Sequence, residues 1–586
     1  MRVKCTFNHP TFASDIAPKF MELTRSFSAI NRLESIAAIQ NTHYDLIVIG
    51  GGITGAGIAL DAASRGLSIL LLDMQDFAAG TSSRSTKLIH GGLRYLKQLE
   101  VGLVREVGQE RALLYQKAPH IVRPKKMLLP IIENGSLGVT ATSFGLYMYD
   151  WLAGVDKGER RSMHNKTETL ALEPLLNENE LLGSGLYYEY QTDDARLTIE
   201  VLKTANKFGA TCLNYTEVLG FTYHTDGKIS GVKAIDHLHH QAFTVFAKQV
   251  VNATGPWVDG LRDKDEHIIG KRLHLTKGVH IVVPYNRLPL QQAVYFDALS
   301  DKRMVFAIPR GNTTYIGTTD TNYKGDIARP QANKQEVNYI LEAANFMFPD
   351  AHLTLDDVES TWAGLRPLIH EDGKAPSDLS RKDEIFFTQN GLISIAGGKL
   401  TGFRKMAERT VDVVVKELYK TEGRSIKNGI TNAITLSGGH FEQPDDIPGY
   451  IEQLAQEQAP LGISQAQIAY WVGLYGSNAP VLLDILVKLP ASKTSNLSDR
   501  LLLAELHYCV QHEMVTSLSD FLIRRTGRLY FNRPEIGDSV FMLLDELEKL
   551  LSLSKQQKLR YYNEFEQEYN AVVQFKEEVE ATAKLL

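Results

Sequence analysis

The feature that most constrains the fold is a glycine-rich run that lies between two short apolar segments early in the chain. Residues 44–57 read YDLIVIGGGITGAG, in which Gly50, Gly52 and Gly55 have the spacing GxGxxG. The β-branched residues before the glycines predict a buried parallel strand, and the residues after them predict a helix that ends near Gly66. In such a unit the glycines allow a tight turn, close approach of the backbone to a pyrophosphate, and close packing of helix on strand.

A second apolar strand completes this unit. Residues 68–72 predict the strand, and Asp73 follows at its end, where an acid can hold the hydroxyls of a ribose. A strand, a helix and a strand within about 30 residues are typical of a dinucleotide-binding βαβ motif. The alternative is a structural glycine turn in some other α/β protein, and the motif by itself does not separate FAD from NAD.

Later segments indicate how the rest of the chain is organised. Residues 249–253 and 392–396 are short apolar strands, each followed closely by a glycine, and they predict further strands of the same sheet. Between them, residues 273–284, 304–309 and 313–318 predict a separate antiparallel sheet, because turn residues lie between the strands. From about Ile430 onward helical periodicity dominates, as in residues 498–525 and 538–555.

We therefore predict an α/β fold in which a discontinuous Rossmann-like cofactor domain carries an inserted antiparallel-sheet substrate domain, followed by a C-terminal α-helical domain. The expected boundaries are an N-terminal extension at 1–43, an oxidoreductase region at 44–429 and a helical domain at 430–586. Within the oxidoreductase region, the cofactor domain takes about 44–125, 190–270 and 355–429, and the substrate domain takes about 126–189 and 271–354.

Composition excludes several classes of function. The net charge of −6 gives no general attraction to nucleic acid. Cys5, Cys212 and Cys509 form no CxxC pair, so neither a disulfide framework nor a zinc site is expected, and we predict no metal site. Residues 1–43 contain no apolar run typical of a secretory signal. We interpret them as an extension rather than a targeting segment.

A polar segment follows the βαβ unit closely. Residues 80–96 read GTSSRSTKLIHGGLRYL and are dense in hydroxyls, small residues and cations. Such a segment can run beneath an extended dinucleotide and bring side chains to its reactive ring, although an ordinary polar loop has the same composition.

Several motifs in a fixed order give a more specific indication. They are the glycine run, TSSRSTKLIHGGLRYL at 81–96, NATGPWV at 252–258, TKGVHIVVP at 276–284, IGTTDT at 316–321, AGLRPL at 363–368, GGKLTGFRKMAE at 397–408 and AELHYCVQHEMVTSLSDFLIRRT at 504–526. In these motifs the chain resembles the quinone-linked, FAD-dependent glycerol-3-phosphate dehydrogenases. The extension at 1–43 departs from the family pattern. The chain also lacks a D-x-[DN]-x-[DN]-G calcium loop, which makes it similar to the bacterial type.

The resemblance implies a D-amino-acid-oxidase-like fold, FAD as cofactor, and oxidation of sn-glycerol 3-phosphate to dihydroxyacetone phosphate by hydride transfer to the flavin. It further implies ubiquinone or menaquinone as electron acceptor, a homodimer, and a cytoplasmic location with peripheral attachment to the inner membrane. Two groups of residues suit an interfacial surface: the cations Arg123, Lys125 and Lys126 beside the apolar residues 127–132, and the aromatic residues Tyr147, Tyr149 and Trp151 that follow. A solvated loop over an ordinary core strand explains them equally well.

The resemblance also assigns site residues. The substrate-binding set is Arg94, Tyr95, Arg366, Arg381 and Lys399, of which Arg381 lies outside the motifs. Arginine suits a phosphate because its planar fork binds bidentately. The catalytic set is Lys399, His280 and Arg366, and Lys399, at the start of a predicted helix, is the first candidate for the base. His280 is a second candidate, and its alternative reading is a satisfied core histidine.

The cofactor-binding residues implied by the family are Gly50, Gly52, Gly55, Asp73, Ser82, Ser83, Lys87, Leu88, Ala253, Gly255, Gly398, Leu400 and Thr401. Three other functions stay open. A glycerol-3-phosphate oxidase would pass electrons to O2 and make H2O2. An amine or amino-acid oxidase of the same fold would bind a carboxylate. A flavoprotein without turnover would serve as a binding module.

Overall fold

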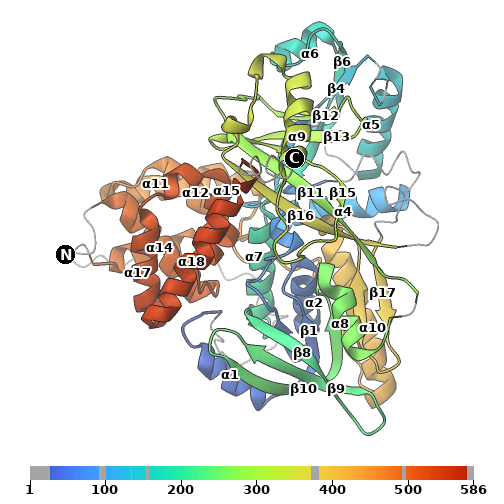
Figure 1. Cartoon of the computed structure of the whole chain (residues 1–586), viewed down its shortest axis with the longest axis vertical. Helices are drawn as coiled ribbons and strands as arrows, with labels where there is room; N and C mark the ends of the chain where they lie inside the picture. The colour runs from blue at the N-terminus through green and yellow to red at the C-terminus, as the bar shows by residue number, and fades with distance from the viewer. Residues whose placement is uncertain are drawn as a thin grey trace, which may run out of the picture.

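The computed structural model describes residues 27–90, 101–133, 135–136, 138–153, 157–268, 270–370, 382–490 and 496–576. Among these residues, the chain forms an eight-stranded sheet, a ten-stranded sheet and a group of C-terminal helices. The two sheets lie one above the other in Figure 1, with the C-terminal helices, orange to red, at one side. This arrangement confirms the predicted fold class.

The first sheet is the dinucleotide-binding type. Its strands run in the order β17-β18-β10-β1-β2-β7, in which β18, β10, β1, β2 and β7 are parallel. Their bounds are β1 (His43–Ile49), β2 (Ile69–Leu72), β7 (Thr211–Leu213), β10 (Gln241–Asn252), β17 (Glu384–Phe387) and β18 (Ile393–Ala396), with β8 (Thr216–Tyr223) and β9 (Ile229–Asp236) added antiparallel beyond β10. Every residue of β1 after His43 is buried, as expected for a strand covered on both faces.

Helices pack on this sheet, and one of them also contacts two others. The helix α2 (Ile53–Ser64) packs against both α7 (Asp194–Lys207) and α10 (Phe403–Glu422). The helix predicted to follow Gly55 is therefore present and starts two residues earlier.

The second sheet has the order β15-β11-β14-β13-β12-β4-β6-β3, with β16 on β11 and β5 on β6. The bounds are β3 (Leu88–Ile89), β4 (Arg123–Ile132), β5 (Ser162–Asn165), β6 (Leu181–Gln191), β11 (Leu273–Pro284), β12 (Ala293–Asp297), β13 (Met304–Arg310), β14 (Thr313–Gly317), β15 (Thr321–Asn322) and β16 (Ser360–Ile369). Apart from the parallel pair β4 and β12, neighbouring strands are antiparallel. The helix α9 (Lys334–Met347) packs on β11, β13 and β14.

The second sheet extends past the boundaries expected from the sequence. We placed residues 355–370 and the segment before 126 in the cofactor domain, but β16 pairs along nearly all of β11, and β3 pairs with β6. The reason is physical: a short apolar strand fits either sheet, and only its long-range partner decides which sheet it joins.

The C-terminal helices are α11 (Ile447–Gln458), α12 (Gln465–Tyr475), α13 (Ala479–Lys488), α14 (Leu497–His512), α15 (Arg528–Phe531), α16 (Arg533–Ile536), α17 (Ser539–Leu551) and α18 (Lys555–Ala571). The continuous helical pattern over 498–525 is interrupted, because α14 ends at His512 and Met514 has a φ of 56°. A π-helix, Asp520–Arg525, follows. The Asp520 carboxylate accepts hydrogen bonds from the N–H groups of Thr516 and Ser517. These local bonds favour the start of a new helix after α14.

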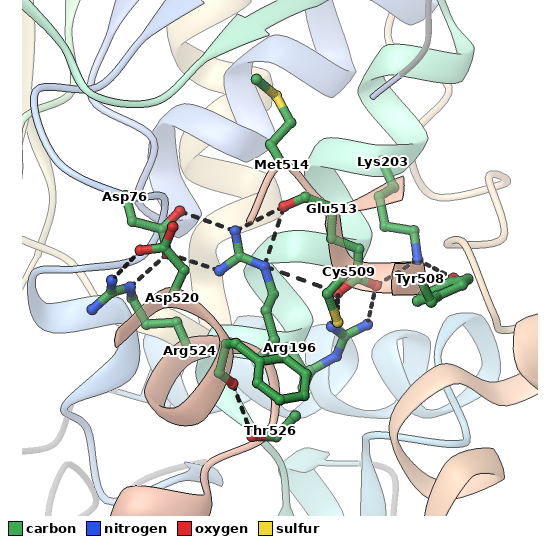
Figure 2. Close-up of polar contacts among 12 residues, drawn as sticks. Asp76, Arg196, Lys203, Tyr508, Cys509, Glu513, Met514, Asp520, Arg524 and Thr526 are labelled. Carbon is green, nitrogen blue, oxygen red and sulfur yellow. Dashed lines mark hydrogen bonds and ion pairs between the residues drawn. The ribbon is translucent and has the colours of Figure 1, made fainter. Parts of the chain in front are cut away.

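A buried ionic network joins these helices to the first sheet, and Figure 2 shows it. Asp76, in the loop after β2, accepts hydrogen bonds from Arg524 (Nε–Oδ2 2.5 Å) and Arg525 (Nη1–Oδ2 2.8 Å). Glu513 accepts from Arg196 on α7 (Oε2–Nη1 2.5 Å) and from Lys203 (Oε1–Nζ 3.0 Å). All these side chains are at most 7% exposed.

The described part of the N-terminal extension is built into the fold. Arg32, the first residue of α1 (Arg32–Gln40), is buried and donates from Nε to Asp236 Oδ1 at 2.9 Å. The N–H group of Ala29 donates to the carbonyl of Val510 on α14 at 3.0 Å. Residues 27–43 therefore contact both the first sheet and the C-terminal helices.

Within the described residues we find no helix that combines the length and the apolar character needed to cross a membrane.

Candidate active site

A cavity of about 330 Å³ lies at the carboxyl ends of β1, β2 and β10, the place where parallel α/β sheets bind ligands. Its walls come from the glycine run, from the loop after β2, from the segment after β10 and from the segment after β18. Of the predicted cofactor residues and the predicted base, the lining includes Gly50, Gly52, Asp73, Ser82, Ala253, Gly255, Gly398, Leu400 and Lys399.

The glycine positions are fixed by close approach. Gly50 has a φ of 108°, and a Cβ there would lie 2.6 Å from the carbonyl oxygen of Ala253. A Cβ on Gly55 would lie 1.8 Å from the carbonyl oxygen of Gly50, so Gly55 lets α2 pack tightly on the turn. Gly52 is the N-cap of α2, which directs the positive end of the helix dipole toward the cavity.

A second pair of glycines shapes the opposite wall. Gly397 and Gly398 have φ values of 77° and 79°, and a Cβ on either would lie within 2.6 Å of a neighbouring atom. Lys399 follows as the N-cap of a short 3-10 helix, Leu400–Gly402, which continues into α10. The lysine thus stands at a helix start in the cavity wall, as the sequence predicts.

Asp73 closes the cavity at the end of β2. Its carboxylate accepts hydrogen bonds from the N–H groups of Gly51 (2.6 Å) and Gln75 (2.9 Å). Burial raises the pKa of Asp73 to about 6, although the two N–H groups oppose the shift. A glycine cradle, a helix N-terminus and a half-buried carboxylate together fit a dinucleotide such as FAD.

The remaining predicted cofactor residues lie outside the cavity wall. Gly55 allows α2 to pack closely on the glycine turn. Ser83, Leu88 and Thr401 are buried in the protein. Lys87 pairs with Asp194 (Nζ–Oδ1 2.5 Å) and lies 5.7 Å from the centre of the Trp362 ring.

Sequence reasoning missed several lining residues. They are Met74, Gln75, Glu217, Val218, Pro256, Trp257, Leu261 and Lys264. Pro256 and Trp257 lie inside the NATGPWV motif, which could have found them. Glu217 and Lys264 stand in no recognisable pattern, because they reach the cavity from β8 and α8 (Val258–Asp265) only through the tertiary fold.

Arg366 is not part of the cavity lining, although Pro367, its neighbour in the sequence, lines the wall. On β16, its guanidinium donates to Asp320 Oδ1 and to Thr318 Oγ1, both at 3.1 Å. A Cβ on Gly278 of the paired strand would lie 2.4 Å from Arg366 Nη2. A glycine there makes room for the arginine.

His280 lies on β11, the strand that pairs with β16. Thr276, the residue of β11 opposite Arg366, is four residues before it. Its ring stacks on Trp362 with 4.7 Å between centroids, and its Nε2 lies 3.0 Å from Thr86 Oγ1. Burial lowers the pKa of His280 well below its usual value, and the charges of Arg366 and Lys87 lower it further. The imidazole is therefore neutral.

Three predicted substrate residues, Arg94, Tyr95 and Arg381, lie outside the described residues. The described part of the chain contains no group of three or more His, Cys, Asp or Glu side chains that could hold a metal ion.

Comparisons with known proteins match nearly the whole chain. A family model described as FAD dependent oxidoreductase matches residues 45–404, and a model of the C-terminal domain of alpha-glycerophosphate oxidase matches residues 429–558. The aerobic glycerol-3-phosphate dehydrogenase of Staphylococcus aureus is 48% identical over 533 residues, which cover 90% of this chain and 95% of the relative.

Solved structures agree. The glycerol-3-phosphate dehydrogenase from Bacillus halodurans, complexed with FAD, has a TM-score of 0.80 and 46% identity, and the match covers 93% of this chain and 98% of that one. The L-alpha-glycerophosphate oxidase from Mycoplasma pneumoniae shares the fold, with a TM-score of 0.51 and 17% identity over 67% of this chain and 97% of that one. The motifs, the cavity and these relatives together show that the chain belongs to the FAD-dependent glycerol-3-phosphate dehydrogenases.

Proposed function

We propose that the protein oxidises sn-glycerol 3-phosphate to dihydroxyacetone phosphate, with FAD in the 330 Å³ cavity. The observation that carries this proposal is the placement of Arg366 and His280 on the paired strands β16 and β11, beside the cavity that Pro367 lines. When bound, FAD supplies the hydride acceptor, and the protein supplies orientation and charge.

Arg366 would hold the substrate phosphate. Its guanidinium already makes charge-assisted contacts with Asp320, and a phosphate dianion would compete for the same donors. Lys399, in the cavity wall, would add a second positive charge. Arg94, Tyr95 and Arg381 complete the proposed substrate set.

His280 is the proton acceptor that the described residues favour, with Lys399 as the alternative. The imidazole is neutral, which is the form a base needs, but burial first and then the charges of Arg366 and Lys87 lower its pKa, so it is a weak proton acceptor before the substrate binds. A bound phosphate dianion would offset these charges and raise the pKa of His280. Substrate binding would thus activate its own base.

For the electron acceptor we propose ubiquinone or menaquinone, reached by peripheral attachment of a homodimer to the inner membrane from the cytoplasmic side. The strand residues Met127–Ile132, the apolar part of the interfacial surface considered from the sequence, are buried in β4, so they do not form such a surface. The helix α5 (Val139–Ala153) is better suited, because it exposes Val139, Phe144 and Tyr147. The Arg161 guanidinium lies 5.7 Å from the centre of the Tyr147 ring, and aromatic residues beside a cation suit a lipid interface.

Oxygen is the second candidate acceptor, because the family model of the C-terminal domain is named for an oxidase. A quinone acceptor and an oxygen acceptor would use the same substrate residues. Only the fate of the reduced flavin separates the two.

The test begins with purified holoenzyme under anaerobic conditions. Glycerol 3-phosphate should bleach the flavin absorbance, while glycerol, which lacks the phosphate, and an amino acid should not. The bleached enzyme is then mixed in a stopped-flow instrument with either O2 or a soluble quinone analogue. Rapid reoxidation by the quinone and slow peroxide formation support the proposal. Bleaching by an amino acid alone would overturn the substrate, and rapid peroxide formation would overturn the acceptor.

A further inference from the structure

A second cavity, of about 570 Å³, lies where the C-terminal helices meet the second sheet. Its wall is formed by the start of β4, the end of β6, the turn between β13 and β14, and the helices α12, α15 and α16. No residue of this lining also lines the dinucleotide cavity. Its volume falls in the range of about 300–1,000 Å³ that is usual for small-molecule sites.

Positive charge predominates in this lining. The described residues there include the cations Arg123, Lys125, Arg310 and Arg528 and the acids Asp193 and Glu535. Arg310 pairs with Asp193 (Nη2–Oδ2 2.6 Å), and Arg528 pairs with Glu505, which lies outside the lining (Nη2–Oε2 2.7 Å).

Arg123 and Lys125 have no carboxylate partner within the described parts of the chain. Arg123 Nε donates to the carbonyl of His120 at 3.0 Å, and Lys125 Nζ donates to the carbonyl of Pro309 at 3.3 Å. These two residues are two of the three cations, with Lys126, that precede the apolar residues 127–132. Their surroundings show a pocket wall instead of a membrane surface.

Unsatisfied donors occur in the same wall. Arg310 Nη1 and Arg528 Nη1 are both buried without a hydrogen-bond partner among the described residues, as is the hydroxyl of Thr192. Buried polar atoms in folded proteins normally have a partner. Protein atoms cover these donors, so a ligand in the cavity would reach them only if the side chains shifted.

The cations also act on one another. Loss of hydration lowers the pKa of Arg123 and of Lys125, and the charge of Arg310 lowers the pKa of Arg123 further. An anion bound among them would relieve this repulsion. His120 adds no charge, since burial first and then nearby cations hold its pKa well below the usual value.

We propose that this cavity is a second ligand site, which binds a small organic phosphate through Arg123 and Lys125, while Arg310 and Arg528 add positive charge to the wall. The inference is independent of the reaction proposed above. Arginine forks and a lysine suit a phosphate group, and the polar wall suits a hydrated sugar-like remainder.

The site would bridge parts of the molecule that move apart when it unfolds. Asp193, which holds Arg310, also accepts a hydrogen bond from the N–H group of Arg196 at the start of α7. Its neighbour Asp194 holds Lys87. A ligand here would therefore raise the melting temperature of the holoenzyme, because it binds only when the C-terminal helices are docked.

The test is isothermal titration of the holoenzyme with glucose 6-phosphate, inorganic phosphate and citrate in separate experiments. Glucose 6-phosphate should bind, and its affinity should fall about tenfold or more in Lys125→Gln and in Arg123→Gln, the loss of one charge-assisted bond. The matched control is Lys126→Gln, which removes the same charge one residue further along β4 but lies outside the lining. This control should keep wild-type affinity.

Further variants separate this site from the catalytic one. Binding should persist in Arg366→Ala, and the oxidation of glycerol 3-phosphate by Lys125→Gln should equal that of the wild type. The melting temperatures of the ligand-free variants show whether they fold. Loss of binding in Arg366→Ala with unchanged binding in Lys125→Gln would overturn the proposal, and so would binding of citrate without either phosphate.

Discussion

Asp73 carries a half-buried carboxylate, and among the described residues its hydrogen-bond partners are the main-chain N–H groups of Gly51 and Gln75. Burial raises its pKa to about 6, so half of the apoprotein is protonated there near pH 6. A ribose hydroxyl donates its proton to an ionised carboxylate, so FAD should bind the deprotonated form. We expect the Kd of the apoprotein for FAD to rise about tenfold for each pH unit below 6.

The measurement is quenching of FAD fluorescence by the apoprotein between pH 5 and 8 (a range chosen around the Asp73 pKa). Asp73→Asn should bind more weakly and show no such slope. A wild-type affinity that stays flat across this range would contradict the assignment. The stability of the apoprotein has the opposite dependence, because a raised pKa stabilises the protonated fold. That contribution is complete below the unfolded value of 3.8 and is lost as the pH rises through about 6.

Replacement of the single residue Arg366 should have two separable effects, one on the affinity for the substrate and one on the pKa of His280. Replacing it with alanine removes a charge-assisted bond to the phosphate, which should weaken the affinity for glycerol 3-phosphate by about 1.5–3 kcal/mol. It also removes a cation that lowers the pKa of His280. The acidic limb of the profile of kcat/KM against pH should therefore move to higher pH.

Steady-state kinetics across a pH series would measure both effects of Arg366→Ala. The control is Arg287→Ala, at a part-exposed arginine that pairs with Asp357 and lies outside the cavity lining, which should leave the kinetics unchanged. An unaltered KM would remove Arg366 from the phosphate site. An unaltered acidic limb would remove His280 from the role of base.

At the scale of elements, local requirements were predictable from the sequence. The strand β11 was expected at residues 273–284 and is found there, because alternating apolar residues and flanking turns are local signals. The glycine positions were predictable for the same reason. Each glycine is required where two backbone segments lie too close for a Cβ atom, as Gly55 and Gly50 do.

Pairings between distant elements were not predictable. β16 joins the second sheet because it pairs with β11. The sequence of β16 alone does not indicate this partner. The same register brings Trp362 against His280 and Arg366 across from Thr276. The anionic partners Asp320 and Asp194 of the site cations likewise come from separate segments, so only the fold assembles them.

The βαβ unit gives a prediction at this scale. A Cβ on Gly55 would lie 1.8 Å from the carbonyl oxygen of Gly50, so Gly55→Ala must push α2 away from the turn. We expect the purified variant to lose most of its FAD and to melt at lower temperature. Absorbance at the flavin bands and thermal unfolding are the measurements.

The matched control is Gly102→Ala in α4 (Val101–Lys117), where a Cβ would meet nothing within 4 Å. Alanine in an exposed helix is better than glycine by up to about 1 kcal/mol, so this variant should keep its FAD and its stability. Full FAD occupancy in Gly55→Ala would show that the turn tolerates displacement.

At the scale of the whole molecule, the ionic network of Figure 2 holds the C-terminal helices against the loop after β2 and against α7. Asp76 lies in the loop that runs from Asp73 into the cavity wall, and Arg524 and Arg525 of the C-terminal domain hold it. Docking of the helices therefore also fixes the cofactor loop. Glu513 is the corresponding anion on the C-terminal side, and it faces Arg196 and Lys203 of α7.

Glu513→Gln tests this coupling. The change leaves Arg196 and Lys203 with Glu200 as their remaining carboxylate among the described residues, and removal of one partner from a buried ionic network costs about 3–5 kcal/mol. The pKa of Glu513 is lowered to about 2, because the charges of Arg196 and Lys203 outweigh burial. Its contribution to stability is therefore present above the unfolded value of 4.5 and is lost as the pH falls toward 2.

Denaturant unfolding is the measurement. We expect the free energy of unfolding of Glu513→Gln to be well below that of the wild type at pH 7, and we expect this difference to shrink at pH 3. Glu417→Gln, at an exposed pair with Lys420, should cost less than about 1 kcal/mol at either pH. An equal deficit for Glu513→Gln at both pH values would mean that the glutamate acts by packing and not by charge.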